Sequence, residues 1–225
     1  MTNPISIDSH ATAIQTELFS PVGAANGGVV IIAHGSDGMT EPWAAMIREY
    51  ASSLAAKGFA ALIPNYFEKT GTSPGLHVFS ASSADLSSWV EAIGDAIAFA
   101  RTLPGVPISR VGLLGFSLGG HICLRLRSSA HALVEFFAPE LPQLGGIGAS
   151  KAAPRRVQIH HGLADRLVPF SEAEAIVRTL KHEGADPEIF SYDGAGHGFA
   201  GADPNNATAR RSSKERTLTF FARAL

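Results

Sequence analysis

The chain has 225 residues, which is enough for one domain with a sizeable apolar core and no need for disulfides or metals. Hydrophobic residues make up 45% of the sequence and charged residues 17%, a balance that excludes an intrinsically disordered chain. The formal net charge is −2, and the basic cluster from Arg210 to Arg216 is interrupted by Glu215, so no nucleic-acid partner is expected.

Strand-like and helix-like segments alternate from the N-terminus onward. Residues Ala13–Phe19 alternate apolar and polar, which predicts a half-exposed antiparallel edge strand. The continuous run Val29–Ala33 predicts a strand buried on both faces, and Ala60–Ile63 predicts a second such strand. Between them, apolar residues from Trp43 to Leu54 recur at helical spacing after Pro42, a residue that suits a first helical turn.

The middle of the chain begins with a segment rich in Gly, Ser, Thr and Pro. This segment, Thr70–Ser83, is expected to be a long surface loop. Ser82 and Asp85 have the spacing of a capping box and precede the apolar positions of a helix that reaches Ile97. The run Arg110–Leu114 then predicts another buried strand.

The C-terminal half repeats this alternation. Ser171 and Glu174 have the spacing of a second capping box, and a last helix ends near Phe221. The sequence therefore predicts a single α/β domain over residues 1–225, with a mostly parallel sheet covered by helices on both faces. The remaining strands are expected within His131–Phe137, Val157–His160 and Glu188–Tyr192.

The segment Gly115–Gly120 reads G-F-S-L-G-G and matches the G-x-S-x-G pattern of a nucleophile elbow. A buried strand is predicted before it and a helix after it, which is the context that the pattern requires. In such a turn the backbone is strained and the Ser117 hydroxyl is exposed above the sheet. The Leu118 N–H then lies at a helix start, where it can meet an oxyanion.

A serine hydroxyl needs a base to act as a nucleophile near neutral pH. In this kind of fold the acid follows the serine along the chain and the histidine comes last. Asp165 follows the strand at Val157–His160, and His197 follows the strand at Glu188–Tyr192, so both belong at the carboxyl edge of the sheet. We therefore expect Ser117, Asp165 and His197 to form a catalytic triad, with Asp193 as a rival acid.

Other residues are assigned smaller roles. The second oxyanion donor is expected from the loop His34–Gly38, at Ser36 or alternatively Asp37. His160 and His161 are adjacent in a strand and point to opposite faces, so no metal site is expected. Substrate contacts are expected at three further positions: Lys69, Phe116 and Phe199.

Two features of the sequence indicate in which cellular compartment the protein is expected. No basic stretch followed by an apolar run occurs within residues 1–20, and the longest clean apolar run, Val29–Ala33, is too short to span a bilayer. Cys123 is the single cysteine, which suits a reducing compartment. We expect a cytoplasmic protein without a membrane partner, either a monomer or a homodimer.

Taken together, these motifs resemble the dienelactone hydrolase family, a branch of the α/β hydrolases with little or no lid. The resemblance implies an eight-stranded sheet, hydrolysis of a carboxylic ester or lactone, no cofactor, and a triad at Ser117, Asp165 and His197. It runs through Ile32–Gly38, Gly58–Tyr66, Gly112–Gly120, His161–Asp165, Val168–Pro169, Gly194–Ala200 and Glu215–Phe221.

The sequence also departs from that family. Family members carry a cysteine at the position of Ser117, a glutamate near Gly35 and an arginine at the position of Gly201, while Lys69 replaces a second arginine. These departures favour short-chain esters over dienelactone itself, and the chain is too short for a large lid domain. We expect hydrolysis of small esters or lactones through an acyl-enzyme. The alternatives are a peptidase or thioesterase with the same triad, or a non-catalytic ligand-binding protein of the same fold.

Overall fold

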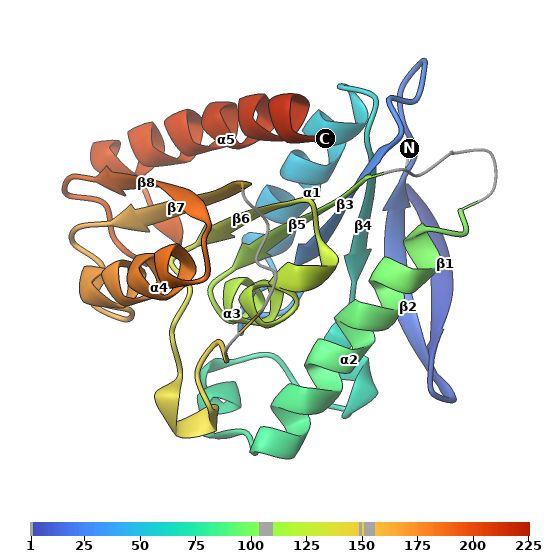
Figure 1. The fold of residues 1–225 in the computed structure, drawn as a ribbon, viewed down its shortest axis with the longest axis horizontal. Helices are drawn as coiled ribbons and strands as arrows, with labels where there is room; N and C mark the ends of the chain where they lie inside the picture. Colours follow the sequence, from blue (N-terminus) through green and yellow to red (C-terminus); the bar gives the residue numbers. More distant parts are fainter. Residues whose placement is uncertain (1, 104–109, 149, 151–155) are drawn as a thin grey trace.

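The computed structural model describes residues 2–103, 110–148, 150 and 156–225, and the strands within them form one eight-stranded sheet (Figure 1). The strands are β1 (Thr2–Ser9), β2 (Thr12–Phe19), β3 (Gly28–Ala33), β4 (Ala60–Pro64), β5 (Arg110–Phe116), β6 (Ala132–Phe136), β7 (Arg156–Gly162) and β8 (Asp186–Tyr192). The α-helices are α1 (Trp43–Ala55), α2 (Ser83–Ala100), α3 (Leu118–Arg125), α4 (Phe170–His182) and α5 (Pro204–Ala224).

The sheet has the order β1-β2-β4-β3-β5-β6-β7-β8. Strands β4, β3, β5, β6, β7 and β8 run parallel, whereas β2 is antiparallel to both of its neighbours. The mostly parallel eight-stranded sheet confirms the expected architecture. Because parallel strands need crossover connections, helices cover both faces of the sheet.

The N-terminal edge differs from the prediction. The strand expected at Ala13–Phe19 is β2, but it is paired on both sides, and the edge strand is β1. The pairing of Ser9 with Thr12 leaves His10 and Ala11 as a two-residue turn, both with positive φ. Such turns usually carry glycine or asparagine, so the sequence offered no turn signal for this hairpin.

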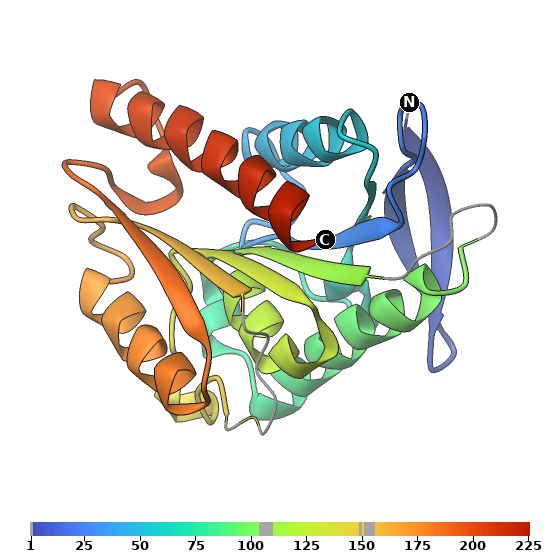
Figure 2. The same cartoon turned by 45° about the horizontal axis from the view of Figure 1, so that its top comes forward.

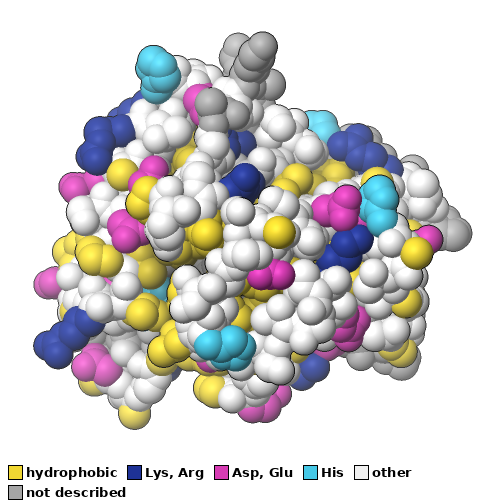
Figure 3. Space-filling view, turned by 90° about the horizontal axis from the view of Figure 1, so that it is seen from below, with side chains coloured by type: hydrophobic (Ala, Val, Ile, Leu, Met, Phe, Trp, Pro, Cys, Tyr) yellow, Lys and Arg dark blue, Asp and Glu magenta, His cyan; other side chains and the backbone are white. Residues whose placement is uncertain are grey.

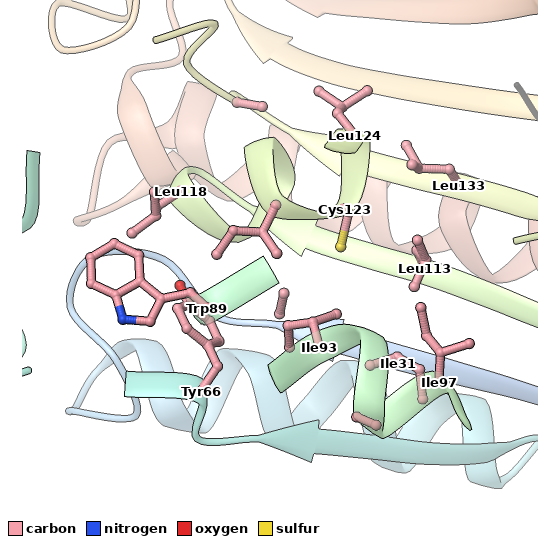
Figure 4. Packing of buried hydrophobic residues seen from close by; sticks show 14 of the residues in the cluster. Ile31, Tyr66, Trp89, Ile93, Ile97, Leu113, Leu118, Cys123, Leu124 and Leu133 are labelled. Carbon is pink, nitrogen blue, oxygen red and sulfur yellow. The ribbon is translucent and has the colours of Figure 1, made fainter. Parts of the chain in front are cut away.

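Each central strand contributes alternate residues to two separate cores. In β3, Val29 and Ile31 belong to the core that includes residues of α2, α3 and α4, whereas Val30 and Ile32 belong to the core that includes residues of α1 and α5. Figure 2 shows α1 and α5 together on one face of the sheet and the other three helices on the opposite face. Figure 4 shows the first core, where Trp89 and Tyr66 lie at one end of the apolar cluster.

One of the two expected capping boxes is present. Ser82 Oγ accepts from the Asp85 N–H at 3.1 Å, and Asp85 Oδ2 accepts from the Ser82 N–H at 3.0 Å, which confirms the predicted start of α2. The box expected at Ser171 is wrong, because α4 starts one residue earlier, at Phe170, after Pro169. The first-turn carboxylate there, on Glu172, accepts a tertiary hydrogen bond instead.

The segment expected as a surface loop, Thr70–Ser83, is partly structured. It contains a short 3₁₀ helix, Leu76–Ser80, whose Val78 is buried in the first core. The Gly75 N–H donates to the Ser36 carbonyl at 2.8 Å, so the segment braces the loop after β3. On the face of the molecule shown in Figure 3, acidic and basic side chains are interspersed rather than segregated. Within the described residues, no helix combines the length and apolar character needed to cross a membrane.

Candidate active site

The turn between β5 and α3 holds Ser117 in a strained backbone conformation, with φ of 51° and ψ of −118°. Glycine is required on both sides of it. A Cβ on Gly115 would lie 2.4 Å from the Gly119 carbonyl oxygen, and a Cβ on Gly119 would lie 2.2 Å from the Ala33 carbonyl oxygen. The Ser117 N–H donates to the Phe136 carbonyl at 2.9 Å, which ties the turn to the end of β6.

Two further loops at the same edge of the sheet supply Asp165 and His197. Asp165 follows β7, and His197 follows β8 in a short 3₁₀ turn, His197–Phe199. The loops interlock through a hydrogen bond from the Ala164 N–H to the Ala195 carbonyl at 3.0 Å. The carboxyl ends of β5, β7 and β8 therefore bring three side chains together that are far apart along the chain.

The His197 imidazole joins the other two side chains. Its Nδ1 lies 2.8 Å from Asp165 Oδ2, and its Nε2 lies 3.1 Å from Ser117 Oγ. A carboxylate can only accept, so Nδ1 donates to Asp165, and in the neutral imidazole Nε2 is then free to accept the proton of the serine hydroxyl. This is the protonation state that a general base requires.

Asp165 is held as a carboxylate by its hydrogen bonds. Burial by itself raises the pKa of this group, but the hydrogen bond and charge of His197 and the N–H groups of Val168 and Leu167 outweigh burial and lower the pKa below its ordinary value. Both N–H groups donate to Oδ1 at 2.9 Å, which leaves Oδ2 for the imidazole. The rival acid Asp193 has no hydrogen bond to His197 in the described part of the chain.

The two residues expected as oxyanion donors are Leu118, which follows Ser117 in the chain, and Ser36. Leu118 is the first residue of α3, where a backbone N–H has no partner within the helix. Ser36 lines the same cleft as Ser117, and a Cβ on the preceding Gly35 would lie 3.4 Å from Ser117 Cβ. No acceptor for the Ser36 N–H occurs among the described residues. Both residues therefore remain candidates for the oxyanion donors.

The cleft around Ser117 is narrow, with a volume of about 40 Å³. Phe116, expected to contact substrate, lines it. Phe199, also expected there, lines a larger cavity of about 390 Å³ next to the cleft. Sequence reasoning missed six cleft residues, because three lie on α1, where they fit a helix that packs on the core, and three lie in turns. They are Trp43, Met46, Ile47, Phe137, Leu167 and Gly198.

Lys69, the third expected substrate contact, lies elsewhere. Its ammonium donates to the Ser9 carbonyl at 2.7 Å and pairs with Glu91 at 3.0 Å. It lines neither the cleft nor the adjacent cavity in the described structure. Its partners come from β1 and α2, and β1 is the strand that sequence reasoning did not find. The structure therefore gives no support to a substrate contact at Lys69.

The other histidines near the site are buried and act as packing groups. His160 binds the Tyr192 hydroxyl at 2.8 Å, and His161 Nε2 donates to the Val168 carbonyl at 2.8 Å. Burial lowers the pKa of both imidazoles, so both are neutral. His34 stacks on Tyr66 with ring centroids 4.0 Å apart, and burial lowers its pKa to about 4. In the described residues, no group of three or more potential ligands could hold a metal ion.

A buried carboxyl group that the sequence did not single out supports the turn after β6. Glu135 is fully buried, and its Oε2 accepts from the Ala138 N–H at 2.9 Å. The turn holds Phe137 at a positive φ of 42°, with its ring 4.7 Å from the His197 ring. The hydrogen-bonded carboxyl thus stabilises a strained turn that packs against the imidazole.

Comparison with known proteins adds to this geometry. A model described as the dienelactone hydrolase family matches residues 14–225. A relative from Synechocystis sp., described as a candidate carboxymethylenebutenolidase, is 28% identical over 218 residues, which cover 88% of this chain and 86% of the relative.

Solved structures resemble the whole chain. A candidate dienelactone hydrolase from Klebsiella pneumoniae superposes with a TM-score of 0.76 at 20% identity and covers 99% of this chain and 98% of its own. An α/β serine hydrolase without a lid from Xanthomonas campestris gives 0.72 at 15% identity, over 100% of this chain and 95% of its own. At such identities the likeness shows the fold, which is that of the α/β hydrolases.

Proposed function

The chain belongs to the dienelactone hydrolase family, and from this premise we propose that it hydrolyses small carboxylic esters or lactones, with Ser117 as the nucleophile. The observation that carries the proposal is the His197 imidazole, which lies 2.8 Å from Asp165 and 3.1 Å from the serine hydroxyl. With its Nδ1 proton directed at Asp165, the neutral imidazole offers Nε2 to the hydroxyl, as a general base must.

The proposed reaction has two steps. Ser117 Oγ attacks the ester carbonyl carbon while its proton moves to His197 Nε2, and the carbonyl electrons move onto oxygen, where the N–H groups of Leu118 and Ser36 stabilise the charge. When the intermediate collapses, the bond to the alcohol oxygen breaks and His197 gives that oxygen its proton. Water then repeats the sequence on the acyl-enzyme and releases the acid.

Each part of the site has a defined role in this scheme. Asp165 keeps the imidazole in the required tautomer and stabilises the imidazolium that forms. Each oxyanion donor contributes about 3 kcal/mol of transition-state stabilisation. The narrow cleft of about 40 Å³ favours short acyl chains over long lipids. No cofactor is needed, because every proton and electron pair in the scheme comes from the protein, the substrate or water.

The test is hydrolysis of p-nitrophenyl acetate by the wild type and by Ser117→Ala. The wild type should turn over and the variant should lose at least about 10³-fold in kcat. Ser171→Ala removes a hydroxyl from the exposed start of α4 and serves as the matched control. Equal rates for the wild type and Ser117→Ala would refute the proposal.

Further substrates would separate the proposed activity from others that use the same three side chains. A preference for thioesters or amides over the matched oxygen esters would indicate a thioesterase or a peptidase. Failure of a fluorophosphonate to label Ser117 would indicate a ligand-binding protein without hydrolytic activity.

A further inference from the structure

Residues of α1 and α5 line the larger cavity next to the catalytic cleft. These two helices lie on one face of the sheet (Figure 2). The volume of the cavity is about 390 Å³, which is within the usual size range of small-molecule sites. An ion pair between Glu49 of α1 and Lys214 of α5 bridges the two helices at its rim. Residues of α1 and α5 thus line the cavity together, and other residues of both helices belong to the second core.

Five charged side chains line part of this cavity: Glu49, Arg210, Arg211, Lys214 and Glu215. Five nearly buried aromatic side chains also line it. They come from the ends of β5 and β6, from α1 and from the turn that follows His197. The Phe136 and Phe116 ring centroids are 4.9 Å apart, and those of Phe137 and Phe199 are 5.4 Å apart. Such a surface suits a planar aromatic ligand, because ring edges and faces can pack against it in several orientations. The aromatic residues are Tyr50, Phe116, Phe136, Phe137 and Phe199.

The cavity and the cleft share a wall of four residues: Met46, Phe116, Phe137 and Gly198. Met46 is half-buried, unbranched and flexible, so its side chain can turn aside without a shift of the backbone. A substrate could then reach from the cleft into the cavity.

The position of the cavity shows which part of an ester it would hold. Gly198 and Phe199 follow His197 directly, and the Phe137 ring packs on the imidazole. The four residues 35–38 of the loop after β3 all line the cleft, and none of them lines the larger cavity. In ester cleavage, His197 must reach the oxygen of the leaving alcohol to protonate it. A leaving alcohol that His197 protonates would therefore be next to this cavity.

We propose that the cavity between α1 and α5 binds the alcohol part of the substrate, and that the preferred substrates are esters of a short acid with an aromatic alcohol. The inference rests on the proposed esterase function. In the acylation step the acyl group stays in the narrow cleft on Ser117 Oγ, the ester C–O bond breaks, and the aromatic alcohol leaves with the proton from His197.

Two isomeric esters test the proposal. Benzyl acetate carries its ring on the alcohol, and methyl phenylacetate carries the same ring on the acid, with a similarly basic leaving group in both. The wild type should favour benzyl acetate in kcat/KM by at least about tenfold. Ala207 of α5 lines the cavity, so Ala207→Trp should bring this ratio close to one. Ala207→Leu places a smaller side chain in the cavity and should lower the ratio of the two kcat/KM values by an intermediate factor. This second variant keeps the test decisive if the tryptophan variant does not fold.

The matched control is Ala222→Trp, which adds the same ring to an exposed position near the end of the same helix. It should keep the wild-type ratio. A tenfold preference for methyl phenylacetate in the wild type, or a ratio that Ala207→Trp and Ala207→Leu leave unchanged, would overturn the proposal.

A binding measurement separates this inference from the esterase function. 2-Naphthol should quench or shift the fluorescence of Ser117→Ala protein in a saturable titration, and the effect should be lost when Ala207→Trp is added. If the wild type cleaves no ester but this binding is present and lost as described, the proposed function fails and the aromatic site stands. If esters are cleaved but 2-naphthol does not bind, the aromatic site is refuted.

Discussion

The buried carboxyl group of Glu135 predicts how the free energy of unfolding of this protein changes with pH. The group is fully buried in β6, with one oxygen bound to the Ala138 N–H and no partner for Oε1 among the described residues. Burial raises the pKa of Glu135 to about 8, and the hydrogen bond from Ala138 opposes this only in part. The folded protein therefore holds this carboxyl protonated at neutral pH.

The sign of the effect on stability follows from proton binding in the two states. Between the ordinary pKa of 4.5 and the folded value of about 8, the folded state holds a proton that the unfolded state has lost. The free energy of unfolding therefore falls as pH rises through this window, by about 1.4 kcal/mol per unit. Across the window the group costs at most about 5 kcal/mol, and below pH 4.5 it costs nothing.

Glu135→Gln removes this dependence while its amide oxygen can still accept from Ala138. Urea unfolding followed by circular dichroism at pH 5 and pH 9 gives the free energy of unfolding of each protein. The difference between variant and wild type should be about 3–5 kcal/mol more favourable to the variant at pH 9 than at pH 5. Comparing the two proteins at each pH cancels the titration of all other groups.

Glu174→Gln is the matched control, since it removes a carboxylate from the exposed face of α4. The difference for Glu135→Gln should change between pH 5 and pH 9 by far more than the difference for this control. If the difference for Glu135→Gln stays constant within about 1 kcal/mol, the carboxyl is not protonated in the folded state and the reasoning is wrong.

Three further predictions follow from the site and its supports. Asp165→Asn should lower kcat for p-nitrophenyl acetate by about 10³- to 10⁴-fold with little change in KM, because an amide does not hold the catalytic imidazole in the required tautomer; an unchanged kcat would contradict the assigned role. Ser82→Ala should cost about 1 kcal/mol in urea unfolding through loss of the capping box, whereas Ser83→Ala, one residue inside α2, should cost less. Gly119→Ala should lower the free energy of unfolding by at least about 3 kcal/mol, because the new methyl would lie 2.2 Å from a backbone carbonyl oxygen. Gly94→Ala should raise it by about 1 kcal/mol, because its methyl would meet only one side chain, at 3.8 Å. Equal changes in the midpoint of thermal unfolding for these two variants would contradict this prediction.

Much of the fold and the three central side chains could be predicted from the sequence because their signals are local. A run such as Val29–Ala33 is apolar at every position, since a strand in a parallel sheet is buried on both faces. Gly115 is required by a contact within the turn that holds Ser117, because a Cβ on it would meet Gly119. The positions of Asp165 and His197 followed from the direction of parallel strands, which places successive loops at one edge.

The tertiary structure alone decided the features that depend on contacts between distant segments. The β1 hairpin has no glycine at its turn, and Lys69 binds Ser9 of that hairpin rather than facing the cleft. The raised pKa of Glu135 arises from helices and strands that surround it, and the aromatic cavity arises from the spacing of α1 and α5. Desolvation and enclosed volume are properties of the packed chain, because each depends on neighbours that sequence distance does not specify.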